Sequence, residues 1–175
     1  PPGIPFFLFG VRSAREDAAS PIPNLFNSAV LADNEGNIVS NYHKQALLAF
    51  GEYIPLLPIF SKLPGIPPIG KGFTPGDAPR TLDLPPAIKL APLICYEDLM
   101  PKLARRFVAE NQANLLINLT NDGWFGNSHQ QWQHARSSAW RAIETRRPLV
   151  RCCNNGISCW IDERGRFHGV REPVH

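Results

Sequence analysis

The sequence has no apolar run that approaches the ~20 residues needed for a membrane-spanning helix, so no span is expected within it. A basic start followed by an apolar stretch is also missing, so no signal peptide is predicted. Neither sign of charge is in large excess: the net charge of +3 is too weak and too scattered to indicate nucleic-acid binding. The four cysteines form no C-x-x-C pair, and no histidine lies at zinc-ligand spacing from them. Neither a metal site nor another cofactor is therefore expected.

What the chain does have is the composition of a globular protein. Its 175 residues, 43% hydrophobic and 19% charged, suit one domain or most of one with a real core. The 18 prolines are unusual and favour many short elements joined by structured loops. The Pro- and Gly-rich segment 54–79 fits an ordered covering loop rather than a helix or strand.

Hydrophobic patterning predicts strands that alternate with helices in the middle of the chain and pair as hairpins at both ends. Asp33-Asn34-Glu35-Gly36 is the clearest hairpin turn. Taken alone, the pattern favours an α/β layered domain, in which helices cover one face of a mixed sheet. The predicted strands are 6–11, 27–32, 37–42, 81–84, 88–94, 114–119, 149–153, 157–161 and 167–170, and the predicted helices are 100–111 and 130–146.

Cys95 is the first candidate for chemistry because it follows an apolar strand and precedes helix-forming residues. A fold presents a nucleophile at such a sharp turn, although a buried structural thiol can occupy the same position. A thiol nucleophile needs an accessible thiolate, a proton acceptor and positive charge where an oxyanion forms. Lys44 would supply the charge. The acceptor remains open between histidines and carboxylates: His43, His129, His134, Glu52 and Glu97.

Several motifs around Cys95 occur in a fixed order along the chain. They are Tyr42-His43-Lys44, Phe50-Gly51-Glu52-Tyr53-Ile54-Pro55, Ile94-Cys95-Tyr96-Glu97, Thr120-Asn121-Asp122-Gly123-Trp124-Phe125-Gly126, Gln133-His134, Arg141-Ala142-Ile143-Glu144, Arg147-Pro148 and Asn154-Asn155-Gly156-Ile157. This series resembles the nitrilase-like (carbon-nitrogen hydrolase) catalytic domain of the apolipoprotein N-acyltransferase family, from about residue 6 to residue 170.

The resemblance implies an αββα sandwich that carries a Glu–Lys–Cys triad. Cys95 matches the nucleophile and Lys44 the triad lysine. Glu52 matches a further carboxylate expected to orient that lysine. Tyr96 and Glu97 match the two residues beside the cysteine that the family also requires, and Asn27 matches a family asparagine near the site. The resemblance places these three residues among those that bind the substrate.

The resemblance also implies a reaction and its partners. A phospholipid would donate an acyl chain through a Cys95 thioester to the amino group of a diacylglyceryl-lipoprotein, on the periplasmic side of a bacterial inner membrane. Trp124 and Phe125 would line the acyl pocket or insert into the lipid interface, and 54–73 would form a lid or a membrane-facing loop. A buried aromatic anchor and a packed surface loop are the alternatives.

One part of the family pattern is not found. The triad's general-base Glu belongs to a strand before 6–11, and Glu16 and Glu35 lie in the wrong context to replace it. Residues 1–175 are therefore expected to be a catalytic-domain fragment without that strand and without the family's transmembrane helices. Such a fragment would lack general acid–base help of typically ~10²–10⁴-fold, so it is expected to be inactive alone.

Three other functions remain open: a nitrilase-like amidase that transfers the acyl group to water, a non-catalytic interaction domain on the same sandwich, and a Cys–His hydrolase on another fold. Asn118, Asn121 and Asp122 are expected to fix their loop, and His134, Arg141 and Glu144 to support a helix face. Two alternatives stay open for the other cysteines: a disulfide between Cys159 and either Cys152 or Cys153, or three free thiols.

Overall fold

A computed structural model describes the chain in four stretches: residues 6–17, 20–55, 72–126 and 128–173. The first three strands form an antiparallel sheet in the order β1-β2-β3. Their bounds are β1 (Phe7–Asp17), β2 (Ser20–Ala32) and β3 (Ile38–His43). The predicted turn at 33–36 joins β2 to β3, where Asp33 Oδ1 accepts hydrogen bonds from the amides of Glu35 and Asn37.

The remaining strands form a mixed sheet in the order β4-β5-β6-β7-β8-β9. Within it β5, β6 and β7 run parallel, and the other neighbours are antiparallel. The bounds are β4 (Leu82–Leu84), β5 (Ile88–Ile94), β6 (Leu115–Asn121), β7 (Leu149–Asn154), β8 (Ser158–Ile161) and β9 (Phe167–Arg171). All nine predicted strands are present, but β1 continues to Asp17 and β2 begins already at Ser20, well beyond the predicted 6–11 and 27–32.

Two helices make the crossovers that parallel strands require. Helix α2 (Pro101–Ala109) leads from β5 to β6, and α3 (Gln130–Thr145) leads from β6 to β7. Proline at the first position of α2 lacks an N–H that would be unpaired there in any case. Arg146 ends α3 in the left-handed conformation, just before Pro148. Both helix predictions are confirmed.

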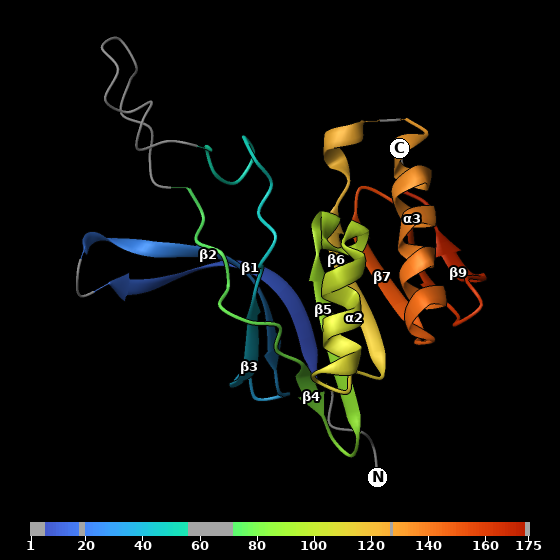
Figure 1. The fold of residues 1–175 in the computed structure, drawn as a ribbon, viewed down its shortest axis with the longest axis horizontal. Helices are drawn as coiled ribbons and strands as arrows, with labels where there is room; N and C mark the ends of the chain where they lie inside the picture. The colour runs from blue at the N-terminus through green and yellow to red at the C-terminus, as the bar shows by residue number, and fades with distance from the viewer. Residues whose placement is uncertain (1–5, 18–19, 56–71, 127, 174–175) are drawn as a thin grey trace.

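The core lies between the helices and the two sheets. Figure 1 shows α2 and α3 in front of the six-stranded sheet and the three-stranded sheet at the side of its β4–β5 edge. Contacts run from β2 to β5 and from β3 to β4. Tyr42 of β3 packs edge-on against Phe107 of α2, with ring centres 5.5 Å apart. The patterning alone favoured a single mixed sheet, whereas the structure has the two sheets that the family resemblance implied.

Part of the segment predicted as a covering loop, residues 56–71, lies outside the described residues, and with it most of the predicted lid. The chain after residue 71 returns alongside the residues that precede that segment. The amide of Phe73 donates to the carbonyl of Glu52, and the amide of Gly76 donates to the carbonyl of Lys44, each at 2.8 Å. A Cβ at Gly76 would lie only 2.2 Å from the carbonyl oxygen of His43, so this close approach requires glycine. Among the described residues, no helix is long and apolar enough to cross a membrane.

Candidate active site

Cys95 lies where the sequence placed it, at a sharp turn after a strand. Strand β5 ends at Ile94, and the short 3-10 helix η1 (Cys95–Leu99) begins immediately. Cys95 has φ of +53°, in the left-handed region that residues with a Cβ avoid at a cost of about 1–3 kcal/mol. The side chain is partly exposed. A strained, accessible thiol at a strand-to-helix turn has the geometry of a presented nucleophile.

Glu97 connects this turn to the end of β3. Its side chain is fully buried, and its Oε2 accepts a hydrogen bond from the amide of Ile94 at 2.8 Å. Its Oε1 accepts from the amides of Gln45 and Ala46, at 2.7 and 3.0 Å, and from the Tyr42 hydroxyl at 3.0 Å. Burial raises the pKa of Glu97, although these four donors act in the opposite direction. One carboxyl group therefore holds the residues on both sides of Lys44 against the Cys95 turn.

Lys44 forms a buried ion pair beside the same turn. Its Nζ lies 2.7 Å from Oε2 of Glu52, and the two side chains are 1% and 12% exposed. The same Nζ lies 5.0 Å from the ring centre of Tyr96, the residue that follows the nucleophile. The Tyr96 hydroxyl donates to the carbonyl of Leu47 at 2.8 Å, which fixes the ring against the Lys44 loop. The ammonium group is thus held close to the residue after Cys95.

Glu52 is oriented from three sides. Besides Lys44, its Oε2 accepts from the amide of Leu48, and its Oε1 accepts from the Asn27 side chain, both at 2.8 Å. Burial alone would raise the pKa of Glu52, but the hydrogen bonds from Lys44, Leu48 and Asn27 outweigh it, and the pKa lies below its usual range. The carboxylate is therefore charged at neutral pH. In this structure Asn27, whose purpose the sequence left open, positions Glu52.

A buried ionic network lies behind the turn. Nη1 of Arg151 donates to Asp98 Oδ2, and Nη2 donates to Asp122 Oδ2, both at 2.8 Å. His134 bridges the same two carboxylates, with Nδ1 2.8 Å from Asp122 and Nε2 3.0 Å from Asp98. Ser138 adds a 2.5 Å hydrogen bond to Asp98. Two cations and two anions balance within this network.

His134 is held as a cation in this network. Burial alone would lower its pKa, but the hydrogen bonds to Asp122 and Asp98 raise the pKa to about 9. Burial would raise the pKa of Asp122, yet its bonds to His134 and Arg151 lower it overall. A histidine already engaged by two carboxylates does not act as a base for Cys95. The structural role expected for His134 fits this placement, and Arg141 donates to Glu144 at 2.8 Å as expected.

Sequence reasoning missed three members of the network: Asp98, Ser138 and Arg151. Arg151 itself could have been noticed, because it lies in the middle of the predicted strand 149–153. A charged side chain is rare inside a buried strand. Such a residue usually has buried partners, although nothing in the sequence identifies them. Asp122 was expected to fix its own loop, whereas its side chain reaches Arg151, 29 positions along the chain.

The predicted aromatic pair contacts this network only through Phe125, among the ring contacts of the described residues. Trp124 and Phe125 lie in the short 3-10 helix η2 (Gly123–Phe125), after β6. Trp124 is 87% exposed, and Phe125 contacts the ring of His134 edge-on at 6.1 Å. In the part of the chain that the structure describes, no ring contact joins either aromatic side chain to Lys44. All four cysteines are free thiols, so neither disulfide is formed.

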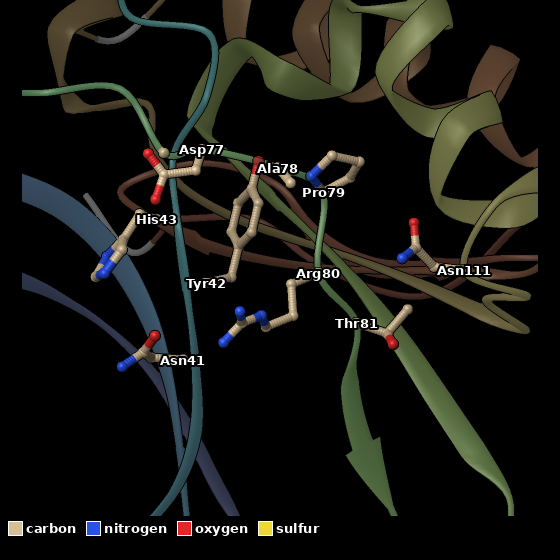
Figure 2. A pocket seen from close by; sticks show the side chains of 10 residues that line it. Asn41, Tyr42, His43, Asp77, Ala78, Pro79, Arg80, Thr81 and Asn111 are labelled. Carbon is tan, nitrogen blue, oxygen red and sulfur yellow. The ribbon is translucent and has the colours of Figure 1, made fainter.

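A pocket of about 330 Å³ lies between the end of β3, residues 76–81 and Asn111 (Figure 2), and its lining does not include Cys95, Lys44 or Glu52. His43 and Asp77 lie on one side of it and Asn111 on the other. Among the described residues, no three His, Cys, Asp or Glu side chains form a metal-binding group.

Comparisons with known proteins identify the family and the fold. Carbon-nitrogen hydrolase is the family whose sequence profile matches, over residues 8–171. An apolipoprotein N-acyltransferase from Allorhizobium ampelinum is 39% identical over 167 residues, covering 94% of this chain and 31% of the relative. One from Bdellovibrio bacteriovorus is 42% identical over 154 residues, covering 86% and 28%. The chain therefore spans about a third of the length of these relatives.

Two solved structures share the fold at low identity. A carbon-nitrogen hydrolase from Helicobacter pylori G27 gives a TM-score of 0.69 at 18% identity, covering 95% of this chain and 57% of that one. A mutant amidase from Nesterenkonia sp. AN1, with acrylamide added at its active-site cysteine, gives 0.64 at 19% identity, covering 97% and 60%. These likenesses place the two sheets and their helices in a nitrilase-like α/β sandwich. The chain belongs to the carbon-nitrogen hydrolase family.

Proposed function

We propose that this chain is the catalytic part of an apolipoprotein N-acyltransferase, with Cys95 as the nucleophile. One observation carries the proposal: a single buried carboxyl group, Glu97, joins the strained Cys95 turn to the segment that bears Lys44. The relatives that carry this name are 35–42% identical to the chain, which supports acyl transfer over other chemistry of the family.

In the first half-reaction the Cys95 thiolate attacks the carbonyl carbon of a phospholipid ester. The carbonyl oxygen becomes an oxyanion, which the Lys44 ammonium stabilises from a site already organised before the reaction. The bond between that carbon and the glycerol oxygen then breaks. The oxygen takes a proton and leaves with the lysophospholipid, while the acyl chain remains on sulfur as a thioester.

In the second half-reaction the free amino group of a diacylglyceryl-cysteine attacks the thioester carbonyl. The nitrogen loses a proton, the carbon–sulfur bond breaks and an amide forms, so the Cys95 thiolate is regenerated. Water would compete for the same thioester, and the site therefore needs to exclude it. Glu52 takes no part in bond making in this scheme, because Asn27 and Leu48 hold it in place to orient Lys44.

The general base of both steps is proposed to come from outside residues 1–175. The chain matches about a third of its relatives' length, which leaves room for a base-bearing strand and membrane helices in a longer parent protein. On this proposal the catalytic domain lies on the periplasmic side of a bacterial inner membrane, and the isolated chain does not turn over. The exposed Trp124 contacts lipid, since an indole ring suits the membrane interface.

Intact-mass spectrometry of the longer parent protein tests this proposal. The protein is incubated in detergent with phospholipid as wild type, Cys95→Ala and Cys152→Ala, the last removing an exposed thiol as a matched control. We expect a mass gain of one acyl chain in the wild type and in Cys152→Ala. The adduct is released by hydroxylamine, as a thioester is, and does not form in Cys95→Ala.

The opposite outcome is equally informative. A folded wild-type protein that never gains the acyl mass would overturn the lipid reaction. Release of ammonia from small amides by that protein would then identify an amide hydrolase, whereas inactivity in both assays would favour a binding domain.

A further inference from the structure

Besides the contacts of Glu97, a second set of contacts holds the turn at Cys95, and Asn118 is at its centre. Asn118 lies in β6, directly beside Leu93 of β5 in the parallel register, and it is fully buried. Its Nδ2 donates to two backbone carbonyls, that of Leu93 at 3.0 Å and that of Cys95 at 2.9 Å. These carbonyls flank Ile94, so one amide group grips the chain on both sides of the residue before the turn.

The orientation of the Asn118 amide follows from its third contact. Its Oδ1 lies 2.8 Å from Nη1 of Arg151. A guanidinium group only donates hydrogen bonds, so the amide oxygen has to face Arg151 and the NH₂ group has to face the two carbonyls. Arg151 in turn donates to Asp98, three positions after Cys95. Both sides of the Cys95 turn are therefore tied to the same guanidinium.

We propose that Asn118 is a positioning residue for the Cys95 nucleophile, and that its amide keeps Cys95 in the left-handed conformation. A residue with a Cβ avoids that conformation unless surrounding contacts impose it. The two hydrogen bonds to the Leu93 and Cys95 carbonyls are such contacts. The proposal rests on the proposed role of Cys95 as the nucleophile, but it requires neither the acyl donor nor the acceptor.

Asn118→Asp tests the proposal because it keeps the shape of the side chain and removes both donated hydrogen bonds. Asn118→Ser is made beside it, since its neutral hydroxyl can hold at most one carbonyl and adds no charge. Asn114→Asp is the matched control. That side chain bridges β5 in the same manner, accepting from the Lys89 amide at 3.0 Å and donating to the Ala87 carbonyl at 2.8 Å, at the far end of the strand from Cys95.

The measurement is the rate of Cys95 alkylation by iodoacetamide between pH 6 and pH 10, followed by peptide mass mapping. Buried Cys159, in the same samples, reports whether the protein stays folded. We expect both Asn118 variants to alkylate Cys95 about tenfold to a hundredfold more slowly at pH 7, because a small displacement of a reacting group has effects of this size. The rates of the variants and the wild type are compared at every pH in this range. Asn114→Asp should stay within about twofold of wild type.

Two outcomes would overturn the proposal. In the first, folded Asn118 variants, with Cys159 still protected, alkylate Cys95 at the wild-type rate and with the wild-type pH profile. In the second, both variants expose Cys159, which would make Asn118 a residue of the fold as a whole. Neither outcome depends on acyl transfer, so the proposed function would stand or fall separately.

Discussion

Removing the negative charge of Glu52 should destabilise the protein strongly, although the site lies near a loop. The change is Glu52→Gln, which keeps the size of the side chain and an oxygen for Lys44 and Leu48. Lys44 is 1% exposed and would be left as a buried ammonium without its counter-charge. Breaking a buried ion pair from one side costs about 3–5 kcal/mol. Because Glu52 keeps 12% exposure and the amide oxygen can still accept, we expect about 2–3 kcal/mol.

Thermal and guanidinium unfolding measure this loss against a matched control. Glu110→Gln makes the same chemical change in the ion pair of Arg106 and Glu110. Nε of Arg106 lies 3.0 Å from Oε1 of Glu110, and the two side chains are 48% and 54% exposed. Such surface pairs contribute about 0–1 kcal/mol. For a chain of this size each kcal/mol moves the unfolding midpoint by about 2–4 °C. Glu52→Gln should therefore unfold about 4–12 °C below the wild type, and Glu110→Gln no more than about 4 °C below it.

A second substitution separates the buried charge from other effects. Adding Lys44→Met to Glu52→Gln removes the unpaired ammonium, so part of the lost stability should return, as expected when two groups interact directly. If Glu52→Gln unfolds at the same midpoint as Glu110→Gln, the ammonium is solvated in the folded protein. Lys44 would then not depend on Glu52 as a counter-charge, despite its 1% exposure.

Three further expectations follow from the burial and charge of single side chains. The folded pKa of His134 is about 9, above the ordinary 6.5, so its contribution to the free energy of unfolding is complete below pH 6.5 and is lost as the pH rises through 9, about 3 kcal/mol in all. Unfolding measured between pH 6 and pH 9 should show this loss in the wild type and in His168→Gln but not in His134→Gln. A flat wild-type profile would contradict it. Burial raises the pKa of Cys153 to about 12, so iodoacetamide at pH 8 should leave it unmodified until the protein is unfolded, as peptide mapping would record. Trp124→Ala should change the free energy of unfolding by less than about 0.5 kcal/mol yet weaken binding to phospholipid vesicles, whereas Trp140→Ala, at an exposed position of α3, should change neither. Equal vesicle binding by both variants would remove Trp124 from the interface.

The fold was predictable where local pattern decides it. The Asp33 turn and the Pro148 stop of α3 are local signals, and both were read correctly. Strand β1 was predicted to end at Val11 because the following residues are mostly polar, yet it continues to Asp17. Its pairing with β2 extends the strand through exposed positions that carry no hydrophobic signal.

Only some residues of the candidate site could be named from the sequence, and few of the contacts between them. Resemblance identified Cys95, Lys44 and Glu52, and the structure brings Lys44 and Glu52 into contact. The left-handed conformation of Cys95 was not predictable, because Cys95 is not a residue type that favours it. The conformation occurs together with the hydrogen bonds of Glu97 and Asn118 to this turn. Asn118 reaches Cys95 across 23 positions, and Glu97 reaches Gln45 across 52 positions. Periodicity and spacing do not describe contacts between segments so far apart.

The guanidinium of Arg151 makes the substitutions around it interdependent. It donates to Asp98, Asn118, Ser138 and Asp122, and through Nε to the carbonyl of Ile157. Losing one partner already leaves the remaining charges imperfectly paired, so a second loss in the same set should cost less than it would alone. The effects of changes at these positions should therefore overlap rather than add. For a chain diverging in sequence, most of the cost of abandoning this arrangement would therefore fall on the first replacement.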